Sequence, residues 1–364
     1  MNNPLFFSGS AAEVGEKLQE SYDRLLDNTK KWAEILTFEP DPQTGMTPKD
    51  LVWRKNKAKL YRYISPDKCR SYRTPILVLY ALINEAYILD LTPGMSMVEY
   101  LVEQGFDVYM LEWGDFAWED RDLTMADIVF DYIANAVRKV CQFSRTDELS
   151  IIGYCMGGTM ASMYASLVSS PRVKNMVFMA APFDFDDAGT TSIWLKDASY
   201  DVDKVVDTLQ LVPSAFIDLG VKLLNPVNNF YATYTRLWKM LDQGVPVHSW
   251  KVLNKWVNDN KNLPGAFYRQ WIKDFYQENK LIKNEVTLRG QRVNLSNIES
   301  SILVLAGTKD HIVLPHQTRV LLDYLPEVDK AYHEFPIGHG GLVFGDTAKN
   351  KVYPLIAEWL EARS

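Results

Sequence analysis

A cysteine stands between glycines near the middle of the chain, in the sequence GYCMGGT at residues 153–159. The short apolar run LSII precedes it, and a helical pattern follows it at residues 160–167. This succession of strand, tight turn and helix is the nucleophile elbow, usually written G-x-S-x-G, with Cys155 in place of the serine. Unpaired N–H groups and the helix dipole favour a thiolate there, and a thiolate attacks carbonyl carbons. The alternative interpretation is a small buried cysteine that happens to lie between glycines.

A carboxylate and a histidine follow in the order expected of a catalytic triad. The apolar run ILVLAG at residues 302–307 predicts a buried strand, and Asp310 lies in the loop at its end. His339 lies between glycines after another short strand. The order nucleophile, acid, histidine is that of the α/β-hydrolases. We therefore predict that Cys155, Asp310 and His339 are catalytic, and that Cys155 is more than a structural residue.

Other residues compete for the roles of acid and base. His311 adjoins Asp310, but neighbours on an extended loop usually point apart. Asp184 and Asp186 are alternatives for the acid, because some hydrolases carry it one strand earlier. Asp310 is favoured because it directly follows an apolar strand, whereas Asp184 and Asp186 begin the inserted segment at residues 184–297. The other histidines are expected in an inserted segment, at the start of a helix and inside a strand: His248, His316 and His333.

The rest of the chain supplies the elements that would position these side chains. Apolar strands alternate with amphipathic helices, which predicts a mostly parallel sheet of the α/β-hydrolase fold. Alternating residues at 51–63 predict antiparallel strands at one edge. In this fold the loop after the strand near residues 76–79 donates one N–H group to the oxyanion hole, assigned here to Leu79. The residue after the nucleophile, Met156, donates the other.

Two segments lie outside this alternation. An amphipathic helix is expected from residue 11 to about residue 36. Residues 184–297 carry irregular helical patterns and many aromatic side chains, which predicts a mainly helical cap whose core they form. The expected organisation is an N-terminal helical segment at 1–46, a catalytic core at 47–183 and 298–364, and a cap insertion at 184–297.

Composition excludes several classes of protein. The 364 residues carry a net charge of −7 without a basic block, which argues against a nucleic-acid binder. The three cysteines show no metal-ligand spacing, so no metal is expected. No apolar run approaches a membrane span and no secretory leader is visible, so a cytoplasmic protein without a transmembrane segment is expected.

With these residues placed, the chain from about residue 47 onward resembles the polyhydroxyalkanoate synthases, the enzymes that make poly-3-hydroxybutyrate. Its short N-terminal region is similar to that of class III and class IV synthases, and the detailed sequence is most similar to class IV of bacilli. Tyr80 and Ala81 stand where larger class I relatives have two prolines, which weakens the assignment of Leu79. The segments that carry the resemblance are TPKDLVW at 47–53, YALINEAYILDL at 80–91, GYCMGGT at 153–159, APFDF at 181–185, NLPG at 262–265, YRQW at 268–271 and DHI at 310–312.

The resemblance implies that Cys155, Asp310 and His339 polymerise 3-hydroxyacyl-coenzyme A, with short-chain 3-hydroxybutyryl-coenzyme A as the expected substrate, through an acyl-cysteine. Coenzyme A would enter as part of the substrate and leave as a product, so no cofactor is expected. The expected partners are a second synthase subunit and the growing polymer granule, in a homodimer or hetero-oligomer. The alternatives are a cysteine-variant thioesterase or dienelactone-type hydrolase, and a granule-coat protein that retains an inactive fold.

Overall fold

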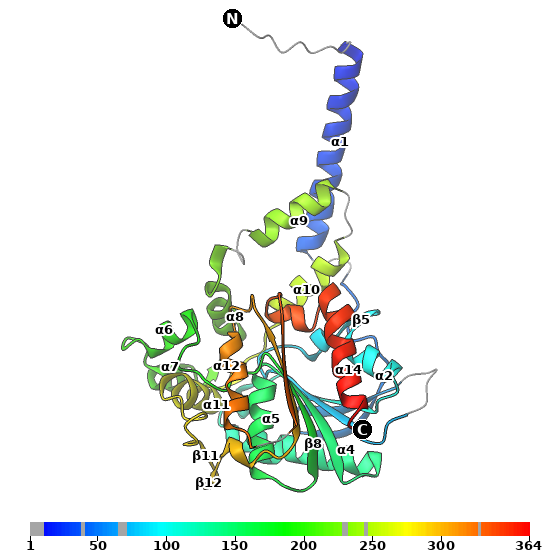
Figure 1. Ribbon diagram of the computed structural model, residues 1–364. Helices are drawn as coiled ribbons and strands as arrows, with labels where there is room; N and C mark the ends of the chain where they lie inside the picture. The colour runs from blue at the N-terminus through cyan, green and yellow to red at the C-terminus, as the bar shows by residue number, and fades with distance from the viewer. Residues whose placement is uncertain (1–10, 38–40, 65–70, 228–231, 244–246, 327–328) are drawn as a thin grey trace, which may run out of the picture. The chain divides into compact units, whose positions relative to one another are not determined.

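The structure is a computed structural model that describes residues 11–37, 41–64, 71–227, 232–243, 247–326 and 329–364. It divides into two compact units, drawn in Figure 1. The smaller unit contains residues 1–43 and 226–255, and the larger contains residues 44–225 and 256–364. The predicted cap is therefore shared between the units, because residues 226–255 cluster with the N-terminal helix. Its boundaries as a functional insertion stay a prediction.

The larger unit is built on an eight-stranded sheet formed by described residues. The first two strands form an antiparallel hairpin that pairs antiparallel with the third in the sheet order, and the remaining strands are parallel. This confirms the predicted fold class and the antiparallel edge. In sheet order the strands are β1 (Lys49–Lys55), β2 (Ala58–Tyr63), β6 (Val108–Glu112), β3 (Ile76–Leu79), β7 (Glu148–Tyr154), β8 (Arg172–Met179), β13 (Ser301–Gly307) and β14 (Lys330–Phe335).

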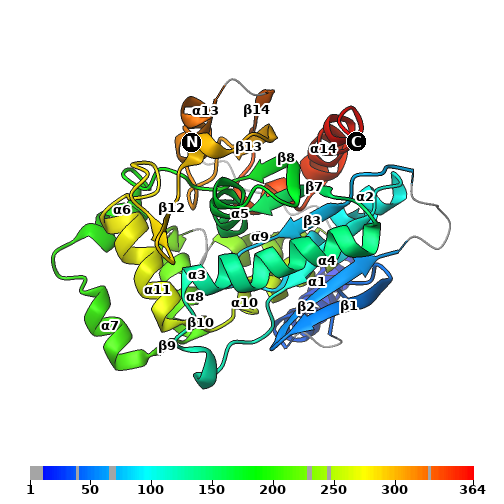
Figure 2. The same ribbon diagram turned by 90° about the horizontal axis from the view of Figure 1, so that it is seen from below.

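Helices cover both faces of this sheet, as Figures 1 and 2 show. The central strands are buried on both sides, which explains why they appear in the sequence as continuous apolar runs. Residues 125–144 form one continuous helical segment whose middle part, Ile128–Ile133, is a π-helix. The flanking helices are α2 (Met97–Glu103), α3 (Met125–Asp127), α4 (Ala134–Ser144), α5 (Met156–Leu167), α12 (Pro315–Arg319), α13 (Leu321–Tyr324) and α14 (Tyr353–Glu361).

A mainly helical region lies between β8 and β13 within the larger unit. One of its predicted core aromatics, Trp271, is buried, whereas Trp194 is 40% exposed, so the expectation of an aromatic core holds for only part of the set. Its helices are α6 (Thr190–Lys196), α7 (Val202–Leu209), α8 (Ser214–Leu223), α11 (Gly265–Gln270) and the π-helix Trp271–Gln277. Small two-stranded sheets pair β4 (Asp90–Thr92) with β5 (Met95–Ser96), β9 (Leu211–Val212) with β10 (Leu263–Pro264), and β11 (Thr287–Leu288) with β12 (Gln291–Arg292).

The smaller unit is helical. Its elements are α1 (Ala11–Leu36), α9 (Thr233–Asp242) and most of α10 (His248–Asn258). Ile35 of α1 packs with Leu237 and Leu241 of α9 in a small apolar cluster, and Trp32 packs against it. The amphipathic N-terminal helix predicted from the sequence is thus present, and part of its apolar face is covered by α9. None of the helices in the described ranges is both long and apolar enough to span a membrane.

Candidate active site

Cys155 occupies the turn between β7 and α5, in a backbone conformation that L-residues rarely adopt. Its φ is 54° and its ψ is −131°, a strained combination that is characteristic of functional sites. The Cys155 N–H donates to the Met179 carbonyl at 2.9 Å, and the Cys155 carbonyl accepts from Gly158 N–H at 2.9 Å. These bonds hold the turn on both sides. The side chain is partly exposed, whereas Cys141 is buried.

The glycines around Cys155 are required by close backbone contacts. A Cβ on Gly153 would lie 2.4 Å from the Gly158 Cα, so the two glycines allow the strand and the helix to meet. A Cβ on Gly157 would lie 2.5 Å from the Leu79 carbonyl oxygen and 2.6 Å from the Tyr80 Cα. The end of β3 therefore lies directly against the elbow. This contact was not visible in the sequence, although the G-x-C-x-G spacing indicated a tight turn.

Asp310 and His339 lie in the loops that follow β13 and β14, at the end of the sheet where Cys155 follows β7. The His339 Nδ1 lies 2.7 Å from the Asp310 Oδ2, and the Asp310 side chain is fully buried. The other carboxylate oxygen accepts from the N–H groups of Ile312 and Val313, at 2.9 and 3.0 Å. Because the buried carboxylate is the acceptor, Nδ1 donates, and Nε2 is left to face another group.

Both Asp310 and Cys155 influence the pKa of the His339 imidazole. Burial lowers the pKa of His339, but the Asp310 carboxylate, which is hydrogen-bonded to the imidazole, and the Cys155 sulfur together raise this pKa well above its ordinary value. A raised imidazole pKa favours the imidazolium form, which can donate a proton to a leaving group. The structure thus brings together Cys155, Asp310 and His339, the three residues selected from the sequence.

The predicted oxyanion donors lie near the elbow. Met156 is the first residue of α5, so its N–H has no acceptor within the helix. Leu79 is the last residue of β3, in register with Gly153 of β7. This places Leu79 beside the elbow, as expected, but its role as a donor stays a prediction.

The competing residues lie elsewhere or have other partners. His316 contacts the Asp187 carbonyl at 2.8 Å, and Asp186 forms an exposed ion pair with Lys196. Asp184 accepts from Asn279 Nδ2 at 2.7 Å through its carboxylate. The remaining histidines, His248, His311 and His333, have exposed side chains.

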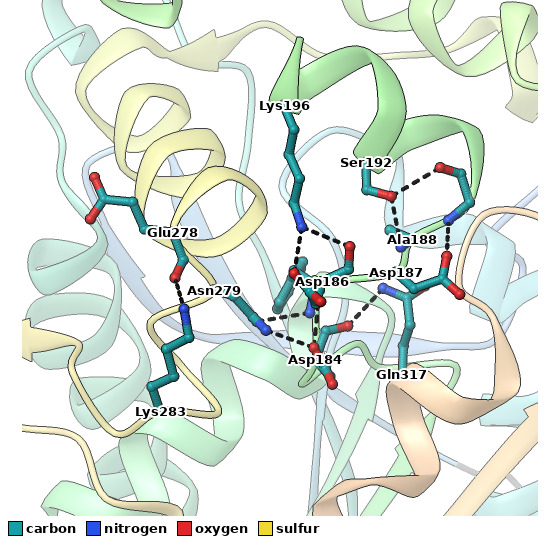
Figure 3. Close-up of polar contacts among 12 residues, drawn as sticks. Asp184, Asp186, Asp187, Ala188, Ser192, Lys196, Glu278, Asn279, Lys283 and Gln317 are labelled. Carbon is teal, nitrogen blue, oxygen red and sulfur yellow. Dashed lines mark hydrogen bonds and ion pairs between the residues drawn. The ribbon is translucent and has the colours of Figure 1, made fainter. Parts of the chain in front are cut away.

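Asp184 belongs to a polar network that sequence reasoning missed, shown in Figure 3. Asn279 Oδ1 accepts from the Phe185 N–H at 2.9 Å, and Gln317 Nε2 donates to the Asp184 carbonyl at 2.9 Å. Asn279 and Gln317 are both buried. The network ties the segment after β8 to the end of the π-helix on one side and to α12, which follows the Asp310 loop, on the other. No spacing signal in the sequence links these three distant segments.

Two tyrosines near the triad also escaped the sequence analysis. The Tyr154 ring lies 5.1 Å from the His339 ring, and its hydroxyl donates to the His339 carbonyl at 3.4 Å. Burial, and then the charge of Cys155, raise the pKa of Tyr276. The Tyr276 ring packs edge-on against Phe185 at 5.0 Å. The only feature of the sequence that pointed to Tyr154 was its position directly before Cys155. Tyr276 lay within the predicted cap, and no spacing pointed to it.

Two family profiles match overlapping parts of the chain. The profile described as "alpha/beta hydrolase fold" matches residues 74–346, and the profile described as "Poly-beta-hydroxybutyrate polymerase (PhaC) N-terminus" matches residues 10–101. The poly(3-hydroxyalkanoate) polymerase subunit PhaC of Haloferax mediterranei is 36% identical over 97% of this chain and 72% of its own length. The chain belongs to the poly(3-hydroxyalkanoate) polymerase family.

Further relatives are similar over nearly all of their own length. The PhaC subunit of a Synechocystis species is 36% identical over 97% of this chain and 95% of its own, and that of Thiocystis violacea is 34% identical over 93% and 96%. Family membership makes the chain an enzyme of the polymerase and acyltransferase type and confirms the resemblance found in the sequence. The finer assignment to class III or class IV stays a prediction.

Solved structures share the fold at low sequence identity. A monoacylglycerol lipase of Paleococcus ferrophilus aligns with a TM-score of 0.52 at 18% identity, over 85% of this chain and all of its own. An esterase of Thermogutta terrifontis aligns with a TM-score of 0.51 at 14% identity, over 88% of this chain and all of its own. These similarities support the α/β-hydrolase fold alone.

Proposed function

We propose that the chain joins 3-hydroxyacyl units from 3-hydroxyacyl-coenzyme A into a polyester, with release of coenzyme A, through an acyl group held on Cys155. Family membership supports the polymerisation of hydroxyalkanoates. The observation that carries the covalent step is a partly exposed cysteine in the strained elbow, next to an imidazole hydrogen-bonded to a buried carboxylate. The short-chain 3-hydroxybutyryl substrate is proposed from the resemblance.

The acylation step can be assigned to residues at this site. The Cys155 thiolate attacks the thioester carbonyl, and the developing oxyanion is stabilised by the Met156 N–H and a second donor at the end of β3. The coenzyme A thiolate leaves and takes a proton from His339. A cysteine suits this step because a thioester exchanges readily with a thiolate of similar basicity. The acyl-cysteine that results remains reactive enough to transfer its acyl group again.

Elongation needs a base more than acylation does. The 3-hydroxyl group of a second unit attacks the acyl-cysteine, and His339 removes the hydroxyl proton while Asp310 stabilises the imidazolium. The ester bond forms as the carbon–sulfur bond breaks, and Cys155 returns as thiolate. Water must be kept away from the acyl group for polymer to form. The rings of Phe185, Trp271 and Tyr276 pack against one another, and Tyr276 is within electrostatic range of Cys155, so this apolar cluster supports that exclusion.

The decisive experiment follows coenzyme A release from 3-hydroxybutyryl-coenzyme A together with the size of the product. We expect thiol release, insoluble polymer and an acyl adduct on Cys155 by mass spectrometry. Cys155→Ala should abolish release while keeping the fold, and Cys141→Ala, which removes the buried thiol, is the control for specific acylation. Free 3-hydroxybutyrate in place of polymer would identify a thioesterase instead.

A partner subunit is proposed from the resemblance and is supported by an apolar stripe on α1. Leu18, Tyr22 and Leu25 are 65%, 56% and 52% exposed, and they follow the alternating four- and three-residue spacing of a coiled-coil seam. The seam continues to Trp32, which packs against the α9 cluster. We propose that a helix of the second synthase subunit covers the exposed part, and that the assembly works at the surface of the polymer granule.

A further inference from the structure

The loop that follows β3 is fastened to a distant segment of the chain. Asn84 forms an isolated antiparallel bridge with Asn260, and its amide donates to the Asn260 side-chain oxygen at 2.9 Å. The Lys261 N–H donates to the Ile83 carbonyl at 2.8 Å. The Trp256 indole donates to the Glu85 carbonyl at 2.8 Å. All these residues belong to the larger unit.

The same loop begins at the elbow. Leu79 and Tyr80 approach Gly157 so closely that no Cβ would fit there. The Tyr80 carbonyl accepts from the Trp113 indole at 3.1 Å, which holds the start of the loop. The contacts at residues 83–85 hold its far end. The position of any N–H donor between these two anchors therefore depends on both.

Lys261 adds an ion pair to the contacts that hold residues 83–85 of this loop. Its side chain is 7% exposed, and its ammonium lies 3.0 Å from both Glu85 Oε1 and Asp115 Oδ1. Burial lowers the pKa of Lys261, but the carboxylates of Glu85 and Asp115 together raise it above its ordinary value, so the ammonium is charged. A buried cation requires such partners, because an unpaired buried charge is strongly unfavourable.

We propose that Lys261 is a positioning residue for acyl transfer to Cys155, because its ion pair with Glu85 fixes the loop after β3 against the elbow. The inference rests on the proposed function, in which the second oxyanion donor lies at the end of β3, where this loop begins. The Lys261 ammonium pairs with Glu85 and Asp115 and not with a residue of the triad. Oxyanion donors stabilise a transition state only when they are held in place before the reaction, so a loosened loop lowers the rate of acylation more than it weakens substrate binding.

The two carboxylates that pair with Lys261 provide a matched pair of variants. Glu85 lies on the loop and is 34% exposed, whereas Asp115 follows β6 and is 87% exposed. Glu85→Gln removes the charge that holds the loop, yet leaves the ammonium paired with Asp115, so the fold is retained. Asp115→Asn leaves the loop contact with Glu85 in place. Both variants change the net charge by the same amount.

The test measures acylation of Cys155 by 3-hydroxybutyryl-coenzyme A in a quenched time course, KM for coenzyme A release, and hydrogen exchange of the peptide that contains residues 79–87. For Glu85→Gln we expect acylation about tenfold slower, KM within about twofold and faster exchange in this peptide. Asp115→Asn should match the parent in all three. Lys261→Arg should keep most of the acylation rate, and Lys261→Met should lose it.

Equal rates in Glu85→Gln and Asp115→Asn would overturn the proposal, as would a loss of rate in Glu85→Gln without a change in exchange. A failure of the proposed function has a different signature, since the parent itself would then form no acyl-cysteine. Hydrogen exchange in the variants would still show whether the ion pair orders the loop, so the two failures are distinguishable.

Discussion

Cys155, Asp310 and His339 divide the chemistry according to the acidity of the groups that they serve. A thiol is far more acidic than a hydroxyl group, so acylation of Cys155 needs little help from a base once the thiolate has formed. Removal of the proton from a 3-hydroxyl group is harder and requires an aligned imidazole. The hydrogen bond from His339 to the buried Asp310 supplies that alignment. Loss of the Asp310–His339 hydrogen bond is therefore expected to slow elongation more than acylation.

Asp310→Asn tests this separation. The amide keeps the shape of the side chain but removes the charge that stabilises the imidazolium and can turn the ring to the wrong tautomer. We expect Cys155 still to be acylated, with an initial burst of coenzyme A, while elongation slows by about 10²-fold or more and short oligomers accumulate. Mass spectrometry of the quenched variant measures both species. Equal losses of acylation and elongation would contradict the separation of roles.

The raised pKa of His339 gives a pH prediction. We expect His339 in the parent to titrate above about 6.5, and in Cys155→Ala to titrate at a lower pH, because the sulfur is one of the groups that raise its pKa. NMR of labelled histidine, assigned with His339→Gln, measures both titrations. An unchanged pKa in Cys155→Ala would show that the sulfur does not interact with the imidazole.

The same shift fixes the sign of the effect on stability. Because the folded-state pKa is raised, protonated His339 contributes stability that is fully present below about pH 6.5 and is lost as the pH rises through the folded-state pKa. Thermal unfolding of the parent and of His339→Gln should therefore differ more at pH 6 than at alkaline pH.

At the scale of elements, the site depends on how closely α5 approaches the neighbouring strands. Gly157 lies against the backbone of Leu79 and Tyr80, and this contact joins the elbow to the end of β3. The Asn279 and Gln317 hydrogen bonds similarly join the segment after β8 to the π-helix and to α12 (Figure 3). These contacts link chain segments that the parallel sheet alone would not hold in register.

Gly157→Ala should be poorly tolerated for this reason. The added methyl would lie 2.5 Å from a backbone oxygen, which cannot move as a flexible side chain can. We expect a loss of about 1–3 kcal/mol in the free energy of unfolding, together with a lower acylation rate. Gly340→Ala, beside His339, is the control because nothing lies within 4 Å of its Cβ. Denaturant unfolding compares them, and similar stability of the two variants would refute the explanation.

At the scale of the whole molecule, the apolar stripe on α1 formed by Leu18, Tyr22 and Leu25 is an exposed surface that a partner can cover. Exposed leucines in a regular seam are typical of a helix with a missing partner. The part of the seam near Trp32 already packs within the smaller unit. A second subunit that extends this packing is the proposed occupant.

Leu18→Lys combined with Leu25→Lys tests this surface. Both side chains are more than half exposed, so the stability of the isolated chain should change by no more than about 0.5 kcal/mol per site. Binding of the co-expressed second subunit should weaken by about tenfold or more, because apolar anchors carry most of the energy of such interfaces. Glu16→Gln with Glu20→Gln makes the same change in net charge on the opposite side of the helix and should bind normally. Normal copurification of the leucine variant would exclude the stripe as the docking surface.

The sequence by itself determined the fold class and the order of the three candidate catalytic residues. Continuous apolar runs mark strands that are buried on both faces, and the G-x-C-x-G spacing marks a turn that needs small neighbours, so both signals are local. The same holds for Asp310 and His339, since parallel strands bring the loops at their carboxyl ends to one edge of the sheet. Only the tertiary structure decided which distant side chains support them. The contacts of Tyr276 and Asn279 with Phe185, and of Lys261 with Glu85, depend on how the inserted helices pack, and no period or spacing in the sequence records that packing.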